Sequence, residues 1–279
     1  MPSEQQILKL IRKITPHSKK YLFDDAAVIE NNLVITTDTL VENTHFTLKT
    51  YLPEEIGWKS MAVNLSDIAA MGAKPFYALI SLSLPKSTSL KWIKNLYKGI
   101  NNCAKKYKTQ IIGGNLTRSN EINITITIIG KTLVKAISKR SNAKPGDLVF
   151  VTGIFGSPKK KPIPQINLGQ KIIKSVNRVA LMDSSDGLAD CLIQISNESK
   201  VKIIIDENRI PLLPRVSTHL ALYTGEDYEL VGTVSKNDCK KIKNLRIIGK
   251  VIKGKNAFLK QKNNKLVKLD LHNAFKHFK

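Results

Sequence analysis

The sequence contains few cysteines. Three occur among 279 residues, and Cys103, Cys191 and Cys239 lie far apart and form no C-x-x-C pair. Disulfide frameworks and cysteine-based zinc sites are recognised by several cysteines at recurring spacings. We therefore expect three reduced thiols, without disulfides or a zinc site.

Long apolar runs are also missing. No run approaches the roughly 20 apolar residues that cross a bilayer as a helix. The opening segment, MPSEQQILKLIRKI, mixes apolar and charged residues and has no signal-peptide core. We expect a cytoplasmic protein that makes no contact with a membrane.

Acidic residues are scarce beside basic ones, 22 against 45, which gives a formal net charge of +23. Such an excess attracts nucleic acid. Most of the positive charge is lysine spread along the chain, however, and arginine, which makes bidentate contacts to phosphates and bases, is uncommon. Nucleic-acid binding is therefore kept only as a minor alternative.

The remaining composition, 42% hydrophobic and 24% charged, suits a globular chain with one large core or two ordinary ones, and the length favours two domains. In RSNAKPGDLVFVTG a Lys-Pro-Gly-Asp turn precedes an apolar run typical of a first strand. We expect an N-terminal domain over 1–138 and a C-terminal α/β domain over 139–279. Strands mixed with single helices predict an α+β fold of two domains, with mixed sheets layered with helices.

The first candidate site residues lie in FDDAAVIENNLVITTDTLVENTHF. Two apolar runs flank Asn31 and Asn32, a pair that tolerates the positive φ of a two-residue hairpin loop. In that register Asp25 lies opposite Asp38, with Cβ atoms about 4.5 to 5.5 Å apart, and a cation should lie between them. Two alternatives stay open: both acids are solvated at the open end of the hairpin, or a longer loop separates them.

The segment PEEIGWKSMAVNLSDIAAMGAKP predicts a helix over 54–71, because acids fit its first turn and Gly and Pro fit its exit. Ser60, Asn64 and Asp67 fall at i, i+4 and i+7 and form one polar stripe on an otherwise apolar helix. An ionised Asp67 would be costly to bury there without a partner. Asp67 either caps a neighbouring backbone turn or binds a metal ion.

A second acidic motif is found in RVALMDSSDGLADCL, where an apolar strand leads into a helix expected over 186–197. Ser184 or Ser185 is a natural N-cap of that helix, and free N–H groups at a helix start also attract phosphate. Asp183 and Asp186 lie three residues apart beside this terminus. The pattern indicates a cation held next to a phosphate.

The chain lacks a G-x-x-x-x-G-K-[ST] loop and any Ser/His/Asp or Cys/His arrangement. Aspartates, threonines and Gly-Gly turns offer only oxygen ligands and backbone amides, and these suit Mg²⁺ with phosphate and water as its remaining ligands. Phosphoryl transfer needs mainly positioning and charge neutralisation. A phosphate acceptor, already ionised at neutral pH, would need no general base.

Seven blocks follow one another between residues 24 and 230: DDAAVI, ITTDTLVENTHF, AVNLSDIAAMGAKP, IIGGNLTRS, RSNAKPGDLVFVTG, LMDSSDGLADCL and TGEDYEL. In this order they resemble the thiamine-monophosphate kinase family, within the superfamily of aminoimidazole ribonucleotide synthetase and selenophosphate synthetase. The last block favours the kinases over their relatives. The resemblance implies an aminoimidazole ribonucleotide synthetase-like fold and an ATP- and Mg²⁺-dependent conversion of thiamine monophosphate to thiamine diphosphate by direct transfer.

The resemblance also implies a homodimer with active sites near the subunit interface, an N-terminal domain that dimerises and binds metal and ATP, and a set of site residues. His45 and Glu226 would contact thiamine phosphate; this assignment rests on the resemblance, because the residues alone favour a solvated loop histidine and a turn acid. The metal ligands would be Asp25, Thr36, Thr37, Asp38, Asp67 and Asp183, with Asp186 binding a further ion, and the ATP contacts would come from Gly114, Arg140 and Ser185.

The chain departs from the family pattern in four places. Asn115 follows Gly-Gly where the family has Asp, and its amide oxygen can still bind Mg²⁺ or face ATP but brings no charge. Phe23 replaces a glycine, PKKK replaces a longer helical stretch, and Phe275 or His272 is a candidate to cover the thiamine ring. We expect a functional site with weakened metal binding; a degenerate member that binds without turnover is the alternative.

Overall fold

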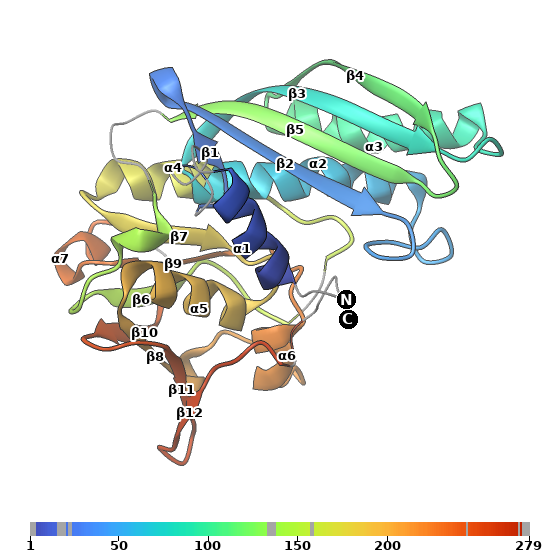
Figure 1. Ribbon diagram of the computed structural model, residues 1–279. Helices are drawn as coiled ribbons and strands as arrows, with labels where there is room; N and C mark the ends of the chain where they lie inside the picture. Colours follow the sequence, from blue (N-terminus) through green and yellow to red (C-terminus); the bar gives the residue numbers. More distant parts are fainter. Residues whose placement is uncertain are drawn as a thin grey trace.

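The computed structural model of the chain describes residues 4–15, 21, 24–132, 138–156, 159–243, 245–272 and 274. It contains a five-stranded and a seven-stranded sheet, each accompanied by helices (Figure 1). Both sheets combine parallel and antiparallel pairs. The expected α+β fold with mixed sheets layered with helices is confirmed. No helix in these ranges is long and apolar enough to span a membrane.

The N-terminal sheet is apolar on one face only. Along its central strand β5 (Asn123–Thr132), Ile124, Ile126 and Ile128 are buried and alternate with threonines on the other face. Helices α2 (Pro53–Ala70) and α3 (Leu90–Lys106) cover the apolar face. The strand order is β1-β2-β5-β3-β4, with β1 (Ala27–Val28), β2 (Leu33–Val41), β3 (Ala73–Leu84) and β4 (Gln110–Arg118).

The turn between β1 and β2 differs from the expected two-residue hairpin. Glu30–Asn32 forms one turn of 3-10 helix, and β1 pairs with β2 through Ala27 opposite Ile35. The register is therefore one residue away from the prediction, which was wrong in placing Asp25 directly opposite Asp38. The longer loop left open above is the one formed, because Glu30 joins the two asparagines in the turn.

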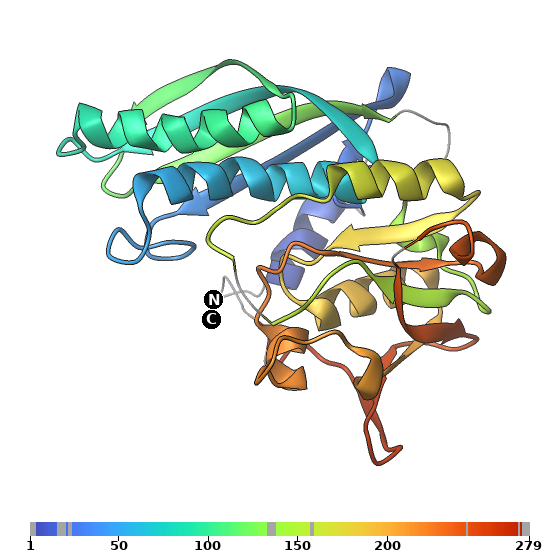
Figure 2. The ribbon, with the colours of Figure 1, turned by 180° about the vertical axis from the view of Figure 1, so that it is seen from behind.

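Helix α2 is buried on nearly all sides, since it lies between the N-terminal sheet and the C-terminal half (Figure 2). Its bounds agree with the predicted helix to within one residue at each end. Pro53 begins it, and Glu55 in the first turn accepts a hydrogen bond from the Leu52 amide at 2.9 Å. Gly57 allows close packing on α3, because a Cβ there would lie 2.0 Å from the Leu96 carbonyl oxygen.

The C-terminal sheet has the order β12-β11-β8-β10-β6-β9-β7 and buries both faces at its centre. One face packs on α5 (Leu188–Ser199) and the other on α2 and α4 (Ile166–Ser175). The strands are β6 (Leu148–Val151), β7 (Val179–Asp183), β8 (Lys202–Asp206), β9 (Leu230–Val234), β10 (Arg246–Ile252), β11 (Ala257–Lys260) and β12 (Leu266–Lys268), and the remaining helices are α1 (Glu4–Ile14), α6 (Thr218–Tyr223) and α7 (Lys236–Cys239).

One hydrophobic core is shared between the two halves. Ile172 and Ile173 of α4 and Leu181 of β7 belong to the same buried cluster as the apolar residues of α2. The helices α2 and α4 lie end to end (Figure 2), and at Gly169 a Cβ would lie 2.1 Å from the Ala69 carbonyl oxygen. The predicted boundary near residue 139 separates the sheets, although this core crosses it.

Candidate functional site

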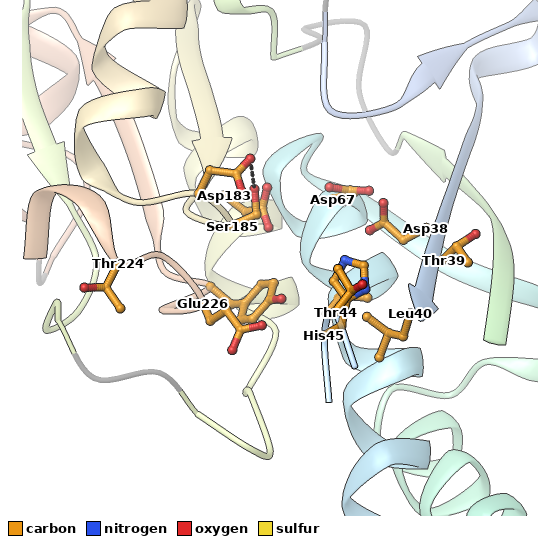
Figure 3. Close-up of a pocket in the computed structure, with 13 residues that line it drawn as sticks. Asp38, Thr39, Leu40, Thr44, His45, Asp67, Asp183, Ser185, Thr224 and Glu226 are labelled. Carbon is orange, nitrogen blue, oxygen red and sulfur yellow. Dashed lines mark hydrogen bonds between the residues drawn. The ribbon is translucent and has the colours of Figure 1, made fainter. Parts of the chain in front are cut away.

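A pocket of about 640 Å³ lies between the two halves of the chain (Figure 3). The N-terminal half contributes residues of β2, the loop that follows it and α2. The C-terminal half contributes the end of β7, the residues just after it and the 224–228 turn. The lining is acidic although the whole chain is strongly basic. Its five carboxylates belong to Asp38, Asp67, Asp183, Asp186 and Glu226.

Three aspartates from three separate elements converge beside this pocket. Carboxylate oxygens of Asp25, Asp67 and Asp183 all lie within 4.8 Å of one another. Burial, and then repulsion from Asp25, raises the pKa of Asp183 to about 8. Burial also raises the pKa of Asp67 well above its ordinary value, with repulsion from Asp38 as the next cause. The cluster therefore attracts positive charge strongly.

Asp38 lies at the open side of the same cluster, at the end of β2. Withdrawal of its carboxyl group from water, and then repulsion from Asp186 and Asp25, raises its pKa to about 6. The strand is fixed to α2 at this point, because the Asp38 amide donates to Asn64 Oδ1 at 2.9 Å. Two residues of the polar stripe on α2 therefore have structural roles. Asn64 holds the backbone of β2, and Ser60 donates to the Gly57 carbonyl within the helix.

Neighbouring side chains orient two of the three aspartates. Thr36 Oγ1 donates to Asp67 Oδ2, and Arg140 Nη2 lies 2.8 Å from Asp25 Oδ1. Arg140 is a cation beside Asp25, but it does not lie between Asp25 and Asp38, where the expected hairpin register placed one. The Arg140 amide also donates to Asp24 Oδ1 at 2.8 Å. Arg140 therefore connects the 24–25 segment to the C-terminal half.

The acidic cluster fits a divalent cation. It offers carboxylate oxygens without nitrogen or sulfur ligands, the donor set that Mg²⁺ prefers. Asp25 Oδ2 is buried and has no hydrogen-bond partner within the described residues. A buried acceptor without a donor is costly, and a bound cation would satisfy it.

The 183–187 turn positions two further polar groups. Helix α5 is capped by Gly187 at φ 102° without a side-chain cap, so the expected serine N-cap is wrong. The Ser184 and Ser185 carbonyls instead accept from the Tyr228 and Glu226 amides at 2.9 and 2.7 Å. Ser185 is left exposed in the pocket, with its hydroxyl 3.5 Å from Asp186 Oδ2.

His45 and Glu226 face the pocket from opposite halves (Figure 3). His45 Nδ1 accepts a hydrogen bond from the Val41 amide at 3.0 Å. Because Nδ1 is the acceptor of this bond, Nε2 is the ring nitrogen that can act as a donor. The Glu226 backbone has φ 58°, an uncommon conformation for a residue other than glycine.

The sequence did not reveal Lys59. It lies on α2 with a fully buried side chain, and its ammonium group is 2.6 Å from Glu226 Oε1. A lysine in an amphipathic segment ordinarily indicates a solvated face. Its burial follows from the contact of α2 with the second half of the chain, and the only signal for it was the apolar character of its helix neighbours.

Three of the residues expected to bind metal or ATP lie away from the acidic cluster of this chain: Thr37, Gly114 and Asn115. The Thr37 and Asn115 side chains are on the open face of the N-terminal sheet, opposite the face that carries Asp38. Two strands, β5 and β3, separate β2 from β4, which carries Gly114 and Asn115. His272 does not line the pocket, and Phe23 and Phe275 lie outside the described residues.

The shortened PKKK segment bridges the two halves beside the pocket. Lys159 Nζ lies 2.9 Å from Glu229 Oε1 in the C-terminal half. Lys160 Nζ donates to the Thr50 carbonyl in the N-terminal half. The segment therefore still connects the halves without the longer helical stretch; Pro158 lies outside the described residues.

Both the sequence and the two-sheet fold of this chain match known proteins. The family model described as "AIR synthase related protein, N-terminal domain" matches residues 23–132. The thiamine-monophosphate kinase of Synechococcus elongatus is 32% identical, covering 99% of this chain and 96% of the relative. That of Bacillus subtilis is 36% identical over 84% of this chain and 85% of the relative.

Solved structures agree with these relatives. The structure described as "AaThiL complexed with AMPPCP and TMP" has a TM-score of 0.87 at 31% identity, covering 99% of this chain and 97% of that one. Thiamine monophosphate kinase from Aquifex aeolicus has a TM-score of 0.83 at 30% identity, over 95% and 97%. The chain belongs to the thiamine-monophosphate kinase family, which confirms the resemblance in its sequence.

Proposed function

We propose that the chain transfers the γ-phosphoryl group of ATP to thiamine monophosphate, giving thiamine diphosphate and ADP. The bond from the γ-phosphorus to the bridging oxygen of ADP breaks, and a phosphate oxygen of thiamine monophosphate forms the new bond. The observation that carries the proposal is the acidic cluster in the pocket between the halves, in a chain of this family. A cytoplasmic location, where ATP is plentiful, fits this reaction.

The acidic cluster supports Mg²⁺ as the metal. Asp25, Asp67 and Asp183 would hold it with Asp38, and Thr36 would bind it or orient Asp67. Asp186 would hold a further ion at the pocket wall. A bound Mg²⁺ would neutralise the negative charge of the phosphoryl group during its transfer from donor to acceptor.

The polar groups around the cluster suit two phosphorylated ligands. Arg140 and Ser185 would contact ATP from the C-terminal side, with Arg140 also holding Asp25. His45 would donate from Nε2 to the acceptor phosphate, because Nδ1 is engaged by the Val41 amide. An acceptor phosphate that is already ionised at neutral pH has no proton to be removed, so no general base is required.

We further propose a homodimer that forms through the open face of the N-terminal sheet, assigned to a domain over 1–138. The middle of this face carries hydroxyls that bond across strands, with Thr39 Oγ1 and Thr125 Oγ1 2.8 Å apart. It also exposes Tyr77 and Leu79. The middle of this face is uncharged, so two copies with a net charge of +23 can meet there without strong repulsion, whereas Lys74 and Lys131 lie at one end of it.

Dimerisation also bears on Asn115 and Gly114. Asn115 projects from this open face, away from the acidic cluster of its own chain. In a dimer formed through this face it would lie at the interface, where it could act on a site shared with the second copy. We expect Asn115→Asp to lower the Mg²⁺ concentration needed for activity. An unchanged Mg²⁺ dependence would mean that Asn115 is only a structural residue of strand β4.

Two measurements test these proposals. Purified protein with ATP, Mg²⁺ and thiamine monophosphate should form thiamine diphosphate, and Asp67→Asn should not; absence of product with the unmodified chain would refute the kinase. Stabilisation by thiamine monophosphate without product would instead indicate a degenerate member.

Sedimentation should give a dimer, and Thr125→Lys, which places a charge in the open face, should give a monomer; a monomeric unmodified chain would refute the dimer.

The alternative role is nucleic-acid binding, which the charge of +23 suggests. It requires an affinity for duplex or single-stranded nucleic acid that falls steeply as salt rises. We expect no such binding at physiological salt, because most of the positive charge is lysine dispersed along the sequence and the described pocket is acidic.

A further inference from the structure

Lys59 is the only lysine in the described part of the chain that is both fully buried and adjacent to the pocket. Its Nζ donates to Glu226 Oε1 at 2.6 Å, to the His45 carbonyl oxygen at 2.9 Å and to Tyr51 Oη at 3.4 Å. A lysine ammonium group has three donors, so these contacts use all of them. One buried cation therefore connects the middle of α2 to both sides of the pocket.

Burial of this charge is difficult to explain by stability alone. Placing an ammonium group in the interior costs several kcal/mol of solvation, and an apolar side chain of similar length is often as stabilising as the ion pair. The surface pair of Lys98 and Glu54, at 2.8 Å, is a useful contrast, because Lys98 is 61% exposed. Lys59 instead fixes the distance between the His45 carbonyl in the N-terminal half and the Glu226 carboxylate in the C-terminal half.

The turn that carries Glu226 has an uncommon backbone conformation. Gly225, Glu226 and Tyr228 all have positive φ, at 74°, 58° and 52°. Residues other than glycine adopt this conformation at a cost, and it persists where surrounding contacts enforce it. The Glu226 side chain is 30% exposed, so it is restrained by Lys59 on one side and open to the pocket on the other.

We propose that Lys59 is a positioning residue for the thiamine phosphate end of the pocket. It holds the Glu226 carboxylate and the His45 loop at a fixed separation, and by occupying Glu226 Oε1 it turns Oε2 toward a hydrogen-bond donor on the acceptor substrate. This inference rests on the proposed function, in which His45 and Glu226 contact thiamine monophosphate. Lys59 touches neither the acidic cluster nor Arg140, and so leaves ATP binding to other residues.

The test is a set of KM values for both substrates. Lys59→Met should raise the KM for thiamine monophosphate about tenfold or more, the effect of losing a buried charge-assisted contact, and leave the KM for ATP within about twofold. Lys98→Met is the matched control and should change neither. Equal changes in both KM values, or a fall in kcat with both KM values unchanged, would overturn the proposal.

A double-mutant cycle identifies the partner. Because Lys59 acts through Glu226, Lys59→Met combined with Glu226→Gln should be little worse than either single variant in thiamine monophosphate binding. Effects that multiply would mean that the two residues act independently and would contradict the proposal. If Lys59→Met does not fold, Lys59→Gln, which can still donate to the His45 carbonyl, is measured in the same way.

Calorimetric binding of thiamine monophosphate separates this inference from the proposed function. A chain that binds thiamine monophosphate but forms no product would refute the kinase while still testing Lys59, whose substitution should weaken that binding about tenfold. A chain that forms product, with binding unaffected by Lys59→Met, would retain the kinase and refute the role of Lys59.

Discussion

Replacing Asp183 with asparagine should make the metal-free protein more stable at neutral pH while removing its response to Mg²⁺. Asp183 is 3% exposed at the end of β7. Burial first, and repulsion from Asp25 second, raise its pKa from 3.8 to about 8. Asparagine has nearly the same shape and no charge, so the substitution isolates the charge of Asp183.

The sign and size of this change in stability follow from the linkage between proton binding and folding. Because the folded-state pKa is raised, the unfolded chain releases the Asp183 proton near pH 4 and the folded chain holds it until about pH 8. The associated stability is complete below pH 4 and is lost as pH rises through this window, by about 1.4 kcal/mol per pH unit. Between pH 5 and 7 this is about 3 kcal/mol, or roughly 10 °C in Tm for a chain of this size.

Thermal unfolding in a chelator at pH 5, 6 and 7 measures this effect. The Tm of the unmodified chain should fall across the series, and that of Asp183→Asn should fall by roughly 10 °C less. Glu30→Gln, which removes an exposed carboxylate, is the control and should follow the unmodified chain. Parallel curves for the unmodified chain and Asp183→Asn would refute the reasoning.

Added Mg²⁺ completes the test. At pH 7 it should raise the Tm of the unmodified chain and displace a proton from the cluster, because metal binding and carboxylate ionisation are linked. Asp183→Asn should show a much smaller rise. An equal rise in both proteins would place the metal away from Asp183.

Three further substitutions test the surrounding structure. Arg140→Met leaves the carboxylate of Asp25, 3% exposed, without its partner, and should lower the free energy of unfolding in urea by about 3 kcal/mol; a loss below about 1 kcal/mol would show that the pair is not coupled. Gly114→Ala would put a Cβ 1.7 Å from a carbonyl oxygen of β3 and should cost about 3 kcal/mol or more by the same assay, whereas a near-neutral result would contradict this close approach. Lys159→Met removes the ion pair to Glu229, whose side chain is 8% exposed, and should cost about 1 to 3 kcal/mol; equal stability would mean that the PKKK bridge contributes nothing.

Much of the acidic site could be predicted from the sequence, because it depends on local pattern. Asp67 is a polar position in a strongly helical, apolar segment, and Asp183 ends an apolar strand. The periodicity of the apolar residues predicts both positions. In the structure Asp67 and Asp183 lie together with Asp25. The family resemblance added Thr36 and Arg140, which contact two of these acids.

What could not be predicted depends on contacts between distant segments. The β1–β2 register was missed by one residue, because a turn of 3-10 helix and a two-residue loop differ only in whether Glu30 joins the turn. The burial of Lys59 needs the second half of the chain to cover α2. The Gly-Gly pair forms no turn at 113–114, because Gly113 and Gly114 pair with β3 and strand β4 runs through them to Arg118.

The core shared by α2, α4 and β7 has a consequence for the order in which the chain can fold. During synthesis the N-terminal sheet and its two helices emerge from the ribosome first, while Ile172, Ile173 and Leu181, which cover part of α2, emerge only afterwards. A nascent chain thus carries an uncovered apolar surface on α2 for the time needed to add several dozen residues. This surface is a natural target for chaperones, and a pause in translation before α4 would prolong its exposure.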